Sequence, residues 1–536
     1  MALLRTGNGA GPRFATGRVP TRLGQPAVVI SLMHRILGAL AAMVLLAVFG
    51  SAAGADALPA TPLEAAAHGR LSTSEEMSAY LDALVARAPA LARKEVLGHS
   101  VQGRPIEALV LASPAPAAGT PRPKVLLVGS QHGGAEPAGG EAMLAIARDL
   151  IAGELRPLLD DLDLILIPNA NPDGRDLKRR ANANRVNINT DFVRLSQPES
   201  RALVQALARY APHAVLDAHE SAVLKRQTLA REGYLTDFDA QFEIANNPAQ
   251  AAGLQTFAQR DLLPALLGRV SAAGLAANHY IGEIVSTRQP ITNGGLTLRN
   301  FRNTAGLGGA LSVLVETRLD PRTDHFASYR NIAVRVQRQR LCIGSFLAEV
   351  RARRAAILAR TSAARAAMQP RTLTLFAAYA ANPDHPTVTL PLRRLDTRAR
   401  EPVRFADHRR VVTADTIRYP AALVVTDHTG LLRELLDRHG IHYRTLTQAV
   451  RLAVLATRFA ARPNLAGRLA PVQETHKNLA IGPGGLVIDL AQPAGRKALL
   501  LLDPRSTSSV FRYPQYAVLV TPGAEFFVYQ ATGGAP

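Results

Sequence analysis

Side chains suited to metal-assisted hydrolysis follow three short apolar runs in the sequence. His132 and Glu136 share the loop after the run at 125–128. His219 follows a second run, and Glu316 ends a third. Imidazole and carboxylate groups are both zinc ligands, and two of them in one short loop can be held rigidly enough to share a metal. The loop therefore predicts half of a metal site, which needs a third ligand and a base from elsewhere in the chain.

The chemistry of a zinc hydrolase calls for this set of side chains. A catalytic zinc takes three protein ligands and keeps one position for water, and two histidines with one glutamate are a known combination. Zinc lowers the pKa of bound water to about 7, so hydroxide is available at neutral pH. A carboxylate away from the metal must take and return the proton, and Glu316 suits this role. An arginine must stabilise the oxyanion of the tetrahedral intermediate, and the loop at 178–180 (Lys-Arg-Arg) offers one.

These side chains lie where apolar strands are expected to end. We expect strands at residues 95–97, 106–111, 125–128, 162–167, 214–217 and 311–315, with helices from residue 74, at 140–152, at 198–210 and at 328–360. Strands that are apolar on both faces and alternate with helices predict an α/β fold, with a largely parallel sheet between helices. In such a sheet, sites form at the carboxyl ends of the strands. We therefore expect the candidate side chains to meet at that edge.

Several motifs occur together, in one order, between about residues 70 and 350. They are LGHSVQGRPI at 97–106, the His132/Glu136 loop, NPDG at 171–174, RANANRVNINTDF at 180–192, DAHE at 217–220 and LVET at 314–317. In this order they resemble the zinc carboxypeptidase family, the carboxypeptidase A-like metallopeptidases. The resemblance implies a mixed α/β/α sheet and one zinc ion bound by His132, Glu136 and His219.

The same resemblance implies roles for other residues near these ligands. Glu316 is similar to the family's general base, and Arg180 to the arginine that polarises the scissile carbonyl. Asn189 is similar to the asparagine that helps hold a substrate carboxylate. Thr190 stands where the family has an arginine that forks onto the peptide's C-terminal carboxylate, and threonine cannot replace a bidentate guanidinium. Two arginines before Glu316, at 299 and 302, could supply that charge, and Arg302 is our candidate substrate-binding residue.

The sequence departs from the family's pattern at two further points. The spacing from His132 to Glu136 is one residue longer than the usual His-x-x-Glu, and the glycines at 133 and 134 can absorb the extra residue. No tyrosine occupies the family's usual position before the base, and Tyr280 is the nearest one. Asp217 is a candidate partner for His219, since alternation along the strand would place both on one face.

The character of the chain changes after about residue 368. Short alternating runs at 372–376, 387–390 and 516–520 predict a β-rich region, which also contains one α/β element over residues 421–445. We therefore divide the chain into residues 1–57, a zinc carboxypeptidase-like catalytic domain at 58–368, and a β-rich C-terminal domain at 369–536. The C-terminal domain carries no chemistry that the sequence identifies.

The N-terminal 57 residues contain a stretch that is typical of a targeting segment. Residues 36–49 form a continuous apolar run, preceded by His34 and Arg35 and followed by small residues. This pattern predicts a signal peptide cleaved after Ala55 or Ala57, and hence a protein exported to a bacterial periplasm or cell exterior, with no membrane span after cleavage. Residues 1–32 are atypical of a signal peptide, which makes Met33 a candidate start. An uncleaved anchor is the alternative.

Composition limits the other possibilities. The chain has 536 residues, a single cysteine (Cys342) and a formal net charge of +20. One cysteine excludes an intramolecular disulfide and a thiolate zinc cluster, so a metal must be held by nitrogen and oxygen ligands. The arginines are scattered and aromatic residues make up only 5% of the chain, so the positive charge does not indicate nucleic-acid binding.

The function expected from these observations is hydrolysis of peptide bonds by an exported, zinc-dependent metallopeptidase of the carboxypeptidase type. If the location is periplasmic, peptides of the cell wall are a plausible substrate. The alternative within the enzyme class is an N-acyl amino acid deacylase, similar to the related desuccinylases and aspartoacylases. The alternative outside it is a non-catalytic binding protein on a peptidase scaffold. The oligomeric state has no signal in the sequence.

Overall fold

The structure is a computed structural model that describes residues 59–114, 121–224, 228–319, 331–367, 369–465 and 467–533. Residues 58–536 form one compact unit. The predicted signal peptide and the candidate start at Met33 lie outside the described residues. Within the described ranges, no helix is both long enough and apolar enough to cross a membrane.

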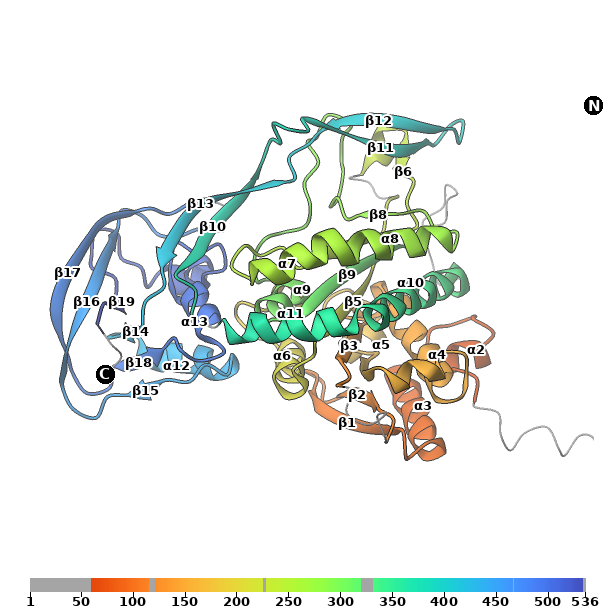
Figure 1. Cartoon of the computed structure of the whole chain (residues 1–536), viewed down its shortest axis with the longest axis horizontal. Coiled ribbons are helices and arrows are strands. Elements are labelled where there is room, and N and C mark those ends of the chain that lie inside the picture. Colours follow the sequence, from red (N-terminus) through yellow and green to blue (C-terminus); the bar gives the residue numbers. More distant parts are fainter. Residues whose placement is uncertain are drawn as a thin grey trace, which may run out of the picture. The chain divides into compact units, whose positions relative to one another are not determined.

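An eight-stranded mixed sheet forms the centre of the first part of the chain (Figure 1). Its strands, in spatial order, are β1 (Ala92–His99), β2 (Pro105–Leu111), β4 (Asp163–Ile167), β3 (Lys124–Gly129), β5 (Ala214–Ser221), β9 (Leu311–Arg318), β7 (Ala240–Ile244) and β8 (Ala277–His279). The four central strands, β4, β3, β5 and β9, are parallel. β2 joins β4 and β7 joins β9 in antiparallel orientation. This sheet confirms the predicted fold class.

Helices cover both faces of the sheet, which explains why the central strands β3 and β4 are apolar on both faces. Val125 and Leu127 of β3 pack into one buried cluster with α3 (Ser74–Arg87), α4 (Ala138–Ala152), α8 (Leu263–Ala272) and α10 (Ile332–Ala352). Leu126 and Val128 face the other way, into a cluster with α6 (Pro198–Tyr210) and α9 (Phe301–Leu307). Successive strand residues point to opposite faces, so a strand covered by helices on both sides buries apolar side chains at successive positions.

Helix boundaries follow local signals where the sequence contains them. Thr73 caps α3: its hydroxyl accepts from the Glu76 amide at 3.1 Å, and the Glu76 carboxylate accepts from the Thr73 amide at 2.9 Å. The single helix expected over 328–360 is wrong. The backbone leaves the helical region at Arg353 (φ −111°, ψ 18°), which separates α10 from α11 (Arg354–Ala366). No glycine or proline marks that break.

The C-terminal part is rich in β-structure, as expected. β10 (Thr372–Ala380) pairs with β13 (Arg410–Arg418), and β11 (Thr387–Arg394) lies between β12 (Arg400–Ala406) and β6 (Tyr234–Thr236). A six-stranded sheet contains β15 (Arg444–Thr445), β18 (Leu486–Asp489), β14 (Ala422–Val425), β19 (Val528–Ala531), β16 (Val450–Phe459) and β17 (Pro471–Ile481), in that order. The expected α/β element is present as β14, α12 (Thr429–Arg438) and β15. The domain boundary at 368/369 stays a prediction, and it coincides with the change from helix to strand.

The strand expected at 516–520 is wrong. This segment contains the end of a short helix, α14 (Pro514–Ala517). Pro514 occupies the first helical turn, where its missing amide hydrogen is not needed. Tyr516 and Val520 are both buried four residues apart. That spacing suits one face of a helical turn rather than an alternating strand.

A buried histidine joins the C-terminal part to the first part and makes folding stability depend on pH. His439, directly after α12, has its Nε2 3.0 Å from the Val193 carbonyl oxygen. Burial lowers the pKa of His439 to about 3. An unfolded histidine has a pKa near 6.5, so the unfolded chain takes up this proton first as the pH falls, and stability is lost progressively below about pH 6.5.

We expect His439→Gln to flatten the pH dependence of unfolding. As the pH is lowered from 6 to 4, the free energy of unfolding should decrease in both proteins. The decrease per pH unit should be about 1.4 kcal/mol smaller in the variant than in the wild type. Urea titrations at each pH measure this slope. The exposed His385, changed to glutamine, is the control and should keep the wild-type slope. Equal slopes for wild type and His439→Gln would contradict the assignment.

Candidate metal centre

Strand register brings the four principal candidate residues to one edge of the sheet. β5 and β9 are parallel neighbours, and His219 lies directly opposite Glu316 in their register. β3 runs parallel to β5 on its other side, with Gly129 opposite Ala218, and its carboxyl end leads into the loop with His132 and Glu136. The edge predicted from the sequence is therefore where these side chains lie.

His132, Glu136 and His219 form a buried cluster that fits a metal ion. One potential ligand atom from each lies within 4.8 Å of the others. His219 Nδ1 is 3.0 Å from Glu136 Oε2, and the two imidazole rings have centroids 4.8 Å apart. His132 Nδ1 is buried and has no hydrogen-bond partner among the described residues. A buried imidazole nitrogen with no partner is costly unless it has a ligand. Two nitrogen donors and one carboxylate are a zinc set.

Asp217 holds His219 in the orientation that a metal ligand needs. Its Oδ1 is 2.9 Å from His219 Nε2, so the other ring nitrogen, Nδ1, faces the cluster. Gln131 donates to the same Asp217 oxygen at 2.5 Å. A carboxylate on the far nitrogen of a ligating histidine fixes its tautomer and raises its basicity. The expectation that Asp217 partners His219 is thus confirmed in geometry.

Electrostatics within the cluster favour a carboxylate and a neutral imidazole. Burial lowers the pKa of His132 to about 3, so this ring is neutral at ordinary pH. Burial alone would raise the pKa of Glu136, but His132, His219 and Arg180 together bring it below its usual value. Burial opposes a charge on His219, yet the Asp217 and Glu136 carboxylates raise its pKa well above the usual value.

Glu316 lies beside the cluster and apart from the three candidate ligands. It is partly buried, and burial together with the Glu136 carboxylate raises its pKa. A raised pKa makes a carboxylate a better proton acceptor. Glu316 also lines a cavity of about 1040 Å³, together with Glu136, Arg180, Gln241 and Tyr280. The cluster therefore opens into a space large enough for a substrate.

Arg180 and Asn189 both reach the cluster. One guanidinium nitrogen of Arg180 bonds to Glu136 Oε1, and the other is 2.9 Å from His132 Nε2. The Arg180 side chain is 54% exposed, so it can also contact a molecule in the cavity. Asn189 Nδ2 is 3.3 Å from His219 Nε2, and its Oδ1 accepts from the Phe301 amide at 2.9 Å. Both residues lie beside the three candidate ligands, and their roles stay predictions.

Comparison with known proteins agrees with this arrangement. Residues 77–211 match the family model described as zinc carboxypeptidase. Carboxypeptidase 2 of Trichophyton tonsurans is 31% identical over 199 residues, which cover 36% of this chain and 37% of that protein. Carboxypeptidase 2 of Trichophyton rubrum is 28% identical over 250 residues, 46% of each protein. Carboxypeptidase D of Mus musculus is 30% identical over 153 residues, 26% of this chain and 11% of that protein.

The matched segment contains His132, Glu136, Arg180 and Asn189. Residues 77–211 belong to the zinc carboxypeptidase family. The chain spans less than half the length of these curated relatives. Among solved structures, the metallo-carboxypeptidase of Burkholderia cenocepacia shares 20% identity at a TM-score of 0.40, covering 52% of this chain and 70% of that one. Because that TM-score is below 0.5, the assignment rests on the sequence matches.

The loop that is one residue longer than the family's is accommodated by two glycines. Residues 133–135 form a single 3-10 turn between His132 and Glu136. Gly133 has φ +49°, and a Cβ there would lie 2.4 Å from the carbonyl carbon of Gly174. A Cβ on Gly134 would lie 2.7 Å from the Lys178 Cα. Only glycine allows this turn to pack so closely against the segment that carries Arg180, and the cluster geometry survives the insertion.

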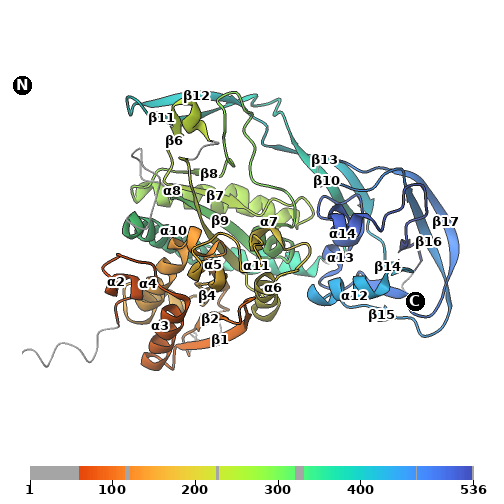
Figure 2. The same cartoon turned by 180° about the vertical axis from the view of Figure 1, so that it is seen from behind.

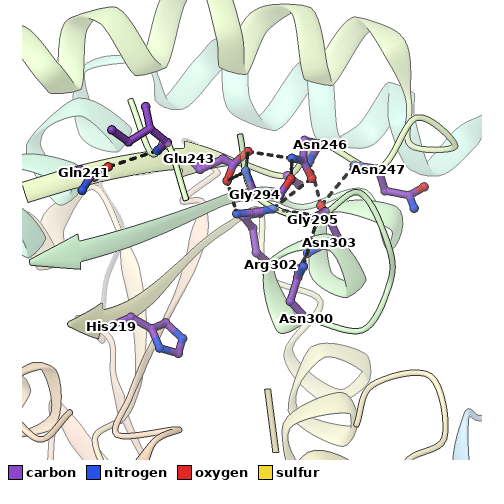
Figure 3. Close-up of polar contacts among 12 residues, drawn as sticks. His219, Gln241, Glu243, Asn246, Asn247, Gly294, Gly295, Asn300, Arg302 and Asn303 are labelled. Atoms are coloured by element: carbon purple, nitrogen blue, oxygen red, sulfur yellow. Dashed lines mark hydrogen bonds and ion pairs between the residues drawn. The ribbon is translucent and has the colours of Figure 1, made fainter. Parts of the chain in front are cut away.

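The structure gives Arg302 and Thr190 internal partners. Arg302 is buried, its Nη1 is 2.7 Å from Glu243 Oε2, and its Nη2 donates to Asn246 Oδ1 at 3.0 Å (Figure 3). A substrate carboxylate would have to compete with Glu243 for this guanidinium. Thr190 donates its hydroxyl to the Asn187 carbonyl at 2.8 Å. Thr190 has no charge to offer a substrate, and the charge of Arg302 is paired with Glu243. The substrate-binding role of Arg302 stays a prediction.

Three residues near the site were not anticipated. Gln241 on β7 lies opposite Glu316 and lines the cavity. The polar–apolar alternation of AQFEI at 240–244 was its signal in the sequence. Glu220 is buried, accepts from the Ala138 amide at 2.9 Å and pairs with Arg335. The ion pair ties β5 to α10, and the Ala138 bond ties β5 to the start of α4, just after Glu136. Its only sequence signal was the neighbouring His219.

Proposed function

We propose that the protein is an exported, zinc-dependent metallopeptidase of the carboxypeptidase type that hydrolyses peptide bonds. The observation that carries the proposal is the buried His132–Glu136–His219 cluster beside Glu316 at a large cavity. Export rests on the apolar run at 36–49, and peptides of the cell wall are the proposed substrates if the location is periplasmic.

The residues of the site have distinct roles in this proposal. His132, Glu136 and His219 would hold one zinc ion, which supplies Lewis acidity and makes water reactive near neutral pH. A Glu316 carboxylate oxygen takes a proton from the attacking water and returns it to the leaving nitrogen. The Arg180 guanidinium, exposed to the cavity, donates to the oxyanion that forms on the substrate carbonyl. Asn189 orients His219 and contacts the substrate next to it.

A second candidate is an N-acyl amino acid deacylase. Two observations on the binding of a C-terminal carboxylate favour this candidate. Thr190 supplies no guanidinium, and Arg302 is paired with Glu243. Neither residue therefore offers a C-terminal carboxylate the bidentate partner typical of an exopeptidase. A non-catalytic binding protein is the third candidate, and it predicts no turnover of any substrate.

A peptide-library digest with and without a chelator separates these candidates. We expect peptide cleavage that falls at least about a hundred-fold when the metal is removed, because the metal supplies the Lewis acidity, and that returns on adding zinc. Mass spectrometry of the products distinguishes trimming from the C-terminus from internal cleavage. N-acyl amino acids in a parallel assay test the deacylase. Cleavage that is unaffected by the chelator, or turnover of nothing, would contradict the proposal.

A further inference from the structure

One wall of the cavity is a loop that the C-terminal part holds in place. The loop joins β8 to α9 and runs from residue 280 to residue 300; we call it the β8–α9 loop. Its first residues, Tyr280, Gly282, Glu283 and Ile284, line the cavity beside Glu316. Its last residue, Asn300, caps α9, whose first amide donates to Asn189. The loop therefore connects the cavity wall to a residue that touches the metal cluster.

The hairpin β11–β12 packs on the first half of this loop (Figures 1 and 2). Ile281, Ile284 and Ile291 of the loop are buried at 4% exposure or less. They belong to one apolar cluster with three side chains of the hairpin, namely Leu390, Leu392 and Phe405. The Ile291 amide also donates to the Ala406 carbonyl at 2.9 Å, and the His408 amide donates to the Ile291 carbonyl at the same distance.

Two hydroxyl groups of the C-terminal part hold the second half of the loop. Tyr379 on β10 donates to the Gly294 carbonyl at 2.7 Å and accepts from Asn246 Nδ2 at 3.0 Å. Ser508, buried between α13 (Gly495–Leu502) and α14, accepts from the Leu298 amide at 2.9 Å. Neither bond depends on a charged group.

The loop in turn fixes the buried ion pair between Arg302 and Glu243, which lies two residues along β7 from the cavity-lining Gln241. The Gly294 amide donates to both Glu243 oxygens, at 3.1 and 2.9 Å (Figure 3). The Gly295 carbonyl accepts from Arg302 at 3.3 Å and from Asn303 at 2.9 Å. A Cβ on Gly294 would lie 2.3 Å from Glu243 Oε2, so the loop and Glu243 are packed too closely for a larger residue at position 294. Displacement of the loop would therefore disturb Glu243 and Arg302 together.

We infer that the C-terminal part acts as a clamp on the β8–α9 loop, and that Tyr379 and Ser508 are positioning residues for the substrate-binding wall of the cavity. The inference rests on the proposed function only in that the cavity is the substrate site. The clamp touches none of His132, Glu136 and His219. Loss of the clamp should thus weaken substrate binding and leave metal binding intact.

The test uses the full-length protein with Tyr379→Phe, Ser508→Ala and the double variant. Tyr443→Phe is the matched control, because its hydroxyl also makes one hydrogen bond in the C-terminal part, to Asp437, away from the loop. Hydrogen exchange should accelerate about five-fold or more at residues 291–300 in the double variant, and little elsewhere. Zinc content should stay at the wild-type level.

Kinetics with a cleaved peptide give the second readout. We expect KM to rise about five- to ten-fold in the double variant while kcat stays within about two-fold, since only binding contacts are disturbed. Unchanged exchange at 291–300, exchange that rises evenly along the chain, or an unchanged KM would each overturn the clamp. If the wild type turns over no substrate, the proposed function fails, and the exchange experiment still decides whether the clamp holds the loop.

Discussion

Glu316→Gln is expected to lower kcat on a cleaved peptide by about a thousand-fold while zinc stays bound, because an amide cannot take the proton from water. The substitution keeps the size of the side chain and removes only its basicity. Glu316 lies opposite His219 in the strand register and is not one of the three clustered ligand residues, so the cluster should remain intact. A loss of this size is within the range that a positioned general base contributes.

Steady-state kinetics and metal analysis of the same preparation measure the two effects of Glu316→Gln. The exposed Glu154, just beyond the far end of α4, is the matched control as Glu154→Gln. The control should retain wild-type turnover. If Glu316→Gln keeps its activity, Glu316 is not the base. If the variant loses its zinc as well, the glutamate belongs to the metal site, and the assignment of Glu136 needs revision.

His219→Ala is expected to remove the bound zinc and, with it, at least about a thousand-fold of the activity. The cluster offers three ligand residues, and two protein ligands seldom retain a catalytic zinc. The zinc affinity of Asp217→Asn should lie between those of His219→Ala and the wild type. This substitution keeps the size of the side chain but removes the charge that orients His219, and such changes cost about ten- to a hundred-fold in metal affinity.

Zinc competition with a chromophoric chelator gives the affinities of both variants. The exposed His385, changed to alanine, is the control and should bind zinc as the wild type does. The graded order, wild type above Asp217→Asn above His219→Ala, is the critical outcome. Equal zinc affinity for wild type and His219→Ala would show that the metal lies elsewhere. Equal affinity for wild type and Asp217→Asn would leave the ligand set standing but remove the role of Asp217.

The sheet and the position of the site were predictable from local patterns. The strands around Leu127, Ile165 and Leu216 are apolar on both faces because helices cover both faces of the sheet, and that pattern is visible in the chain itself. Strands β6 to β8 were not predicted. They are short, and β6 pairs with β11, more than 150 residues away, so no local pattern shows its partner.

The residue types and their order along the chain determined the candidate metal centre. His132 and Glu136 follow β3, and His219 and Glu316 lie near the carboxyl ends of β5 and β9, which meet at one edge because the strands are parallel. Only the tertiary structure decided what surrounds it. Arg302 is adjacent in sequence to Phe301, yet its guanidinium is committed to Glu243, 59 positions away. Tyr379 reaches the same network from the C-terminal part. Such contacts depend on how distant segments pack, and spacing in the sequence carries no information about them.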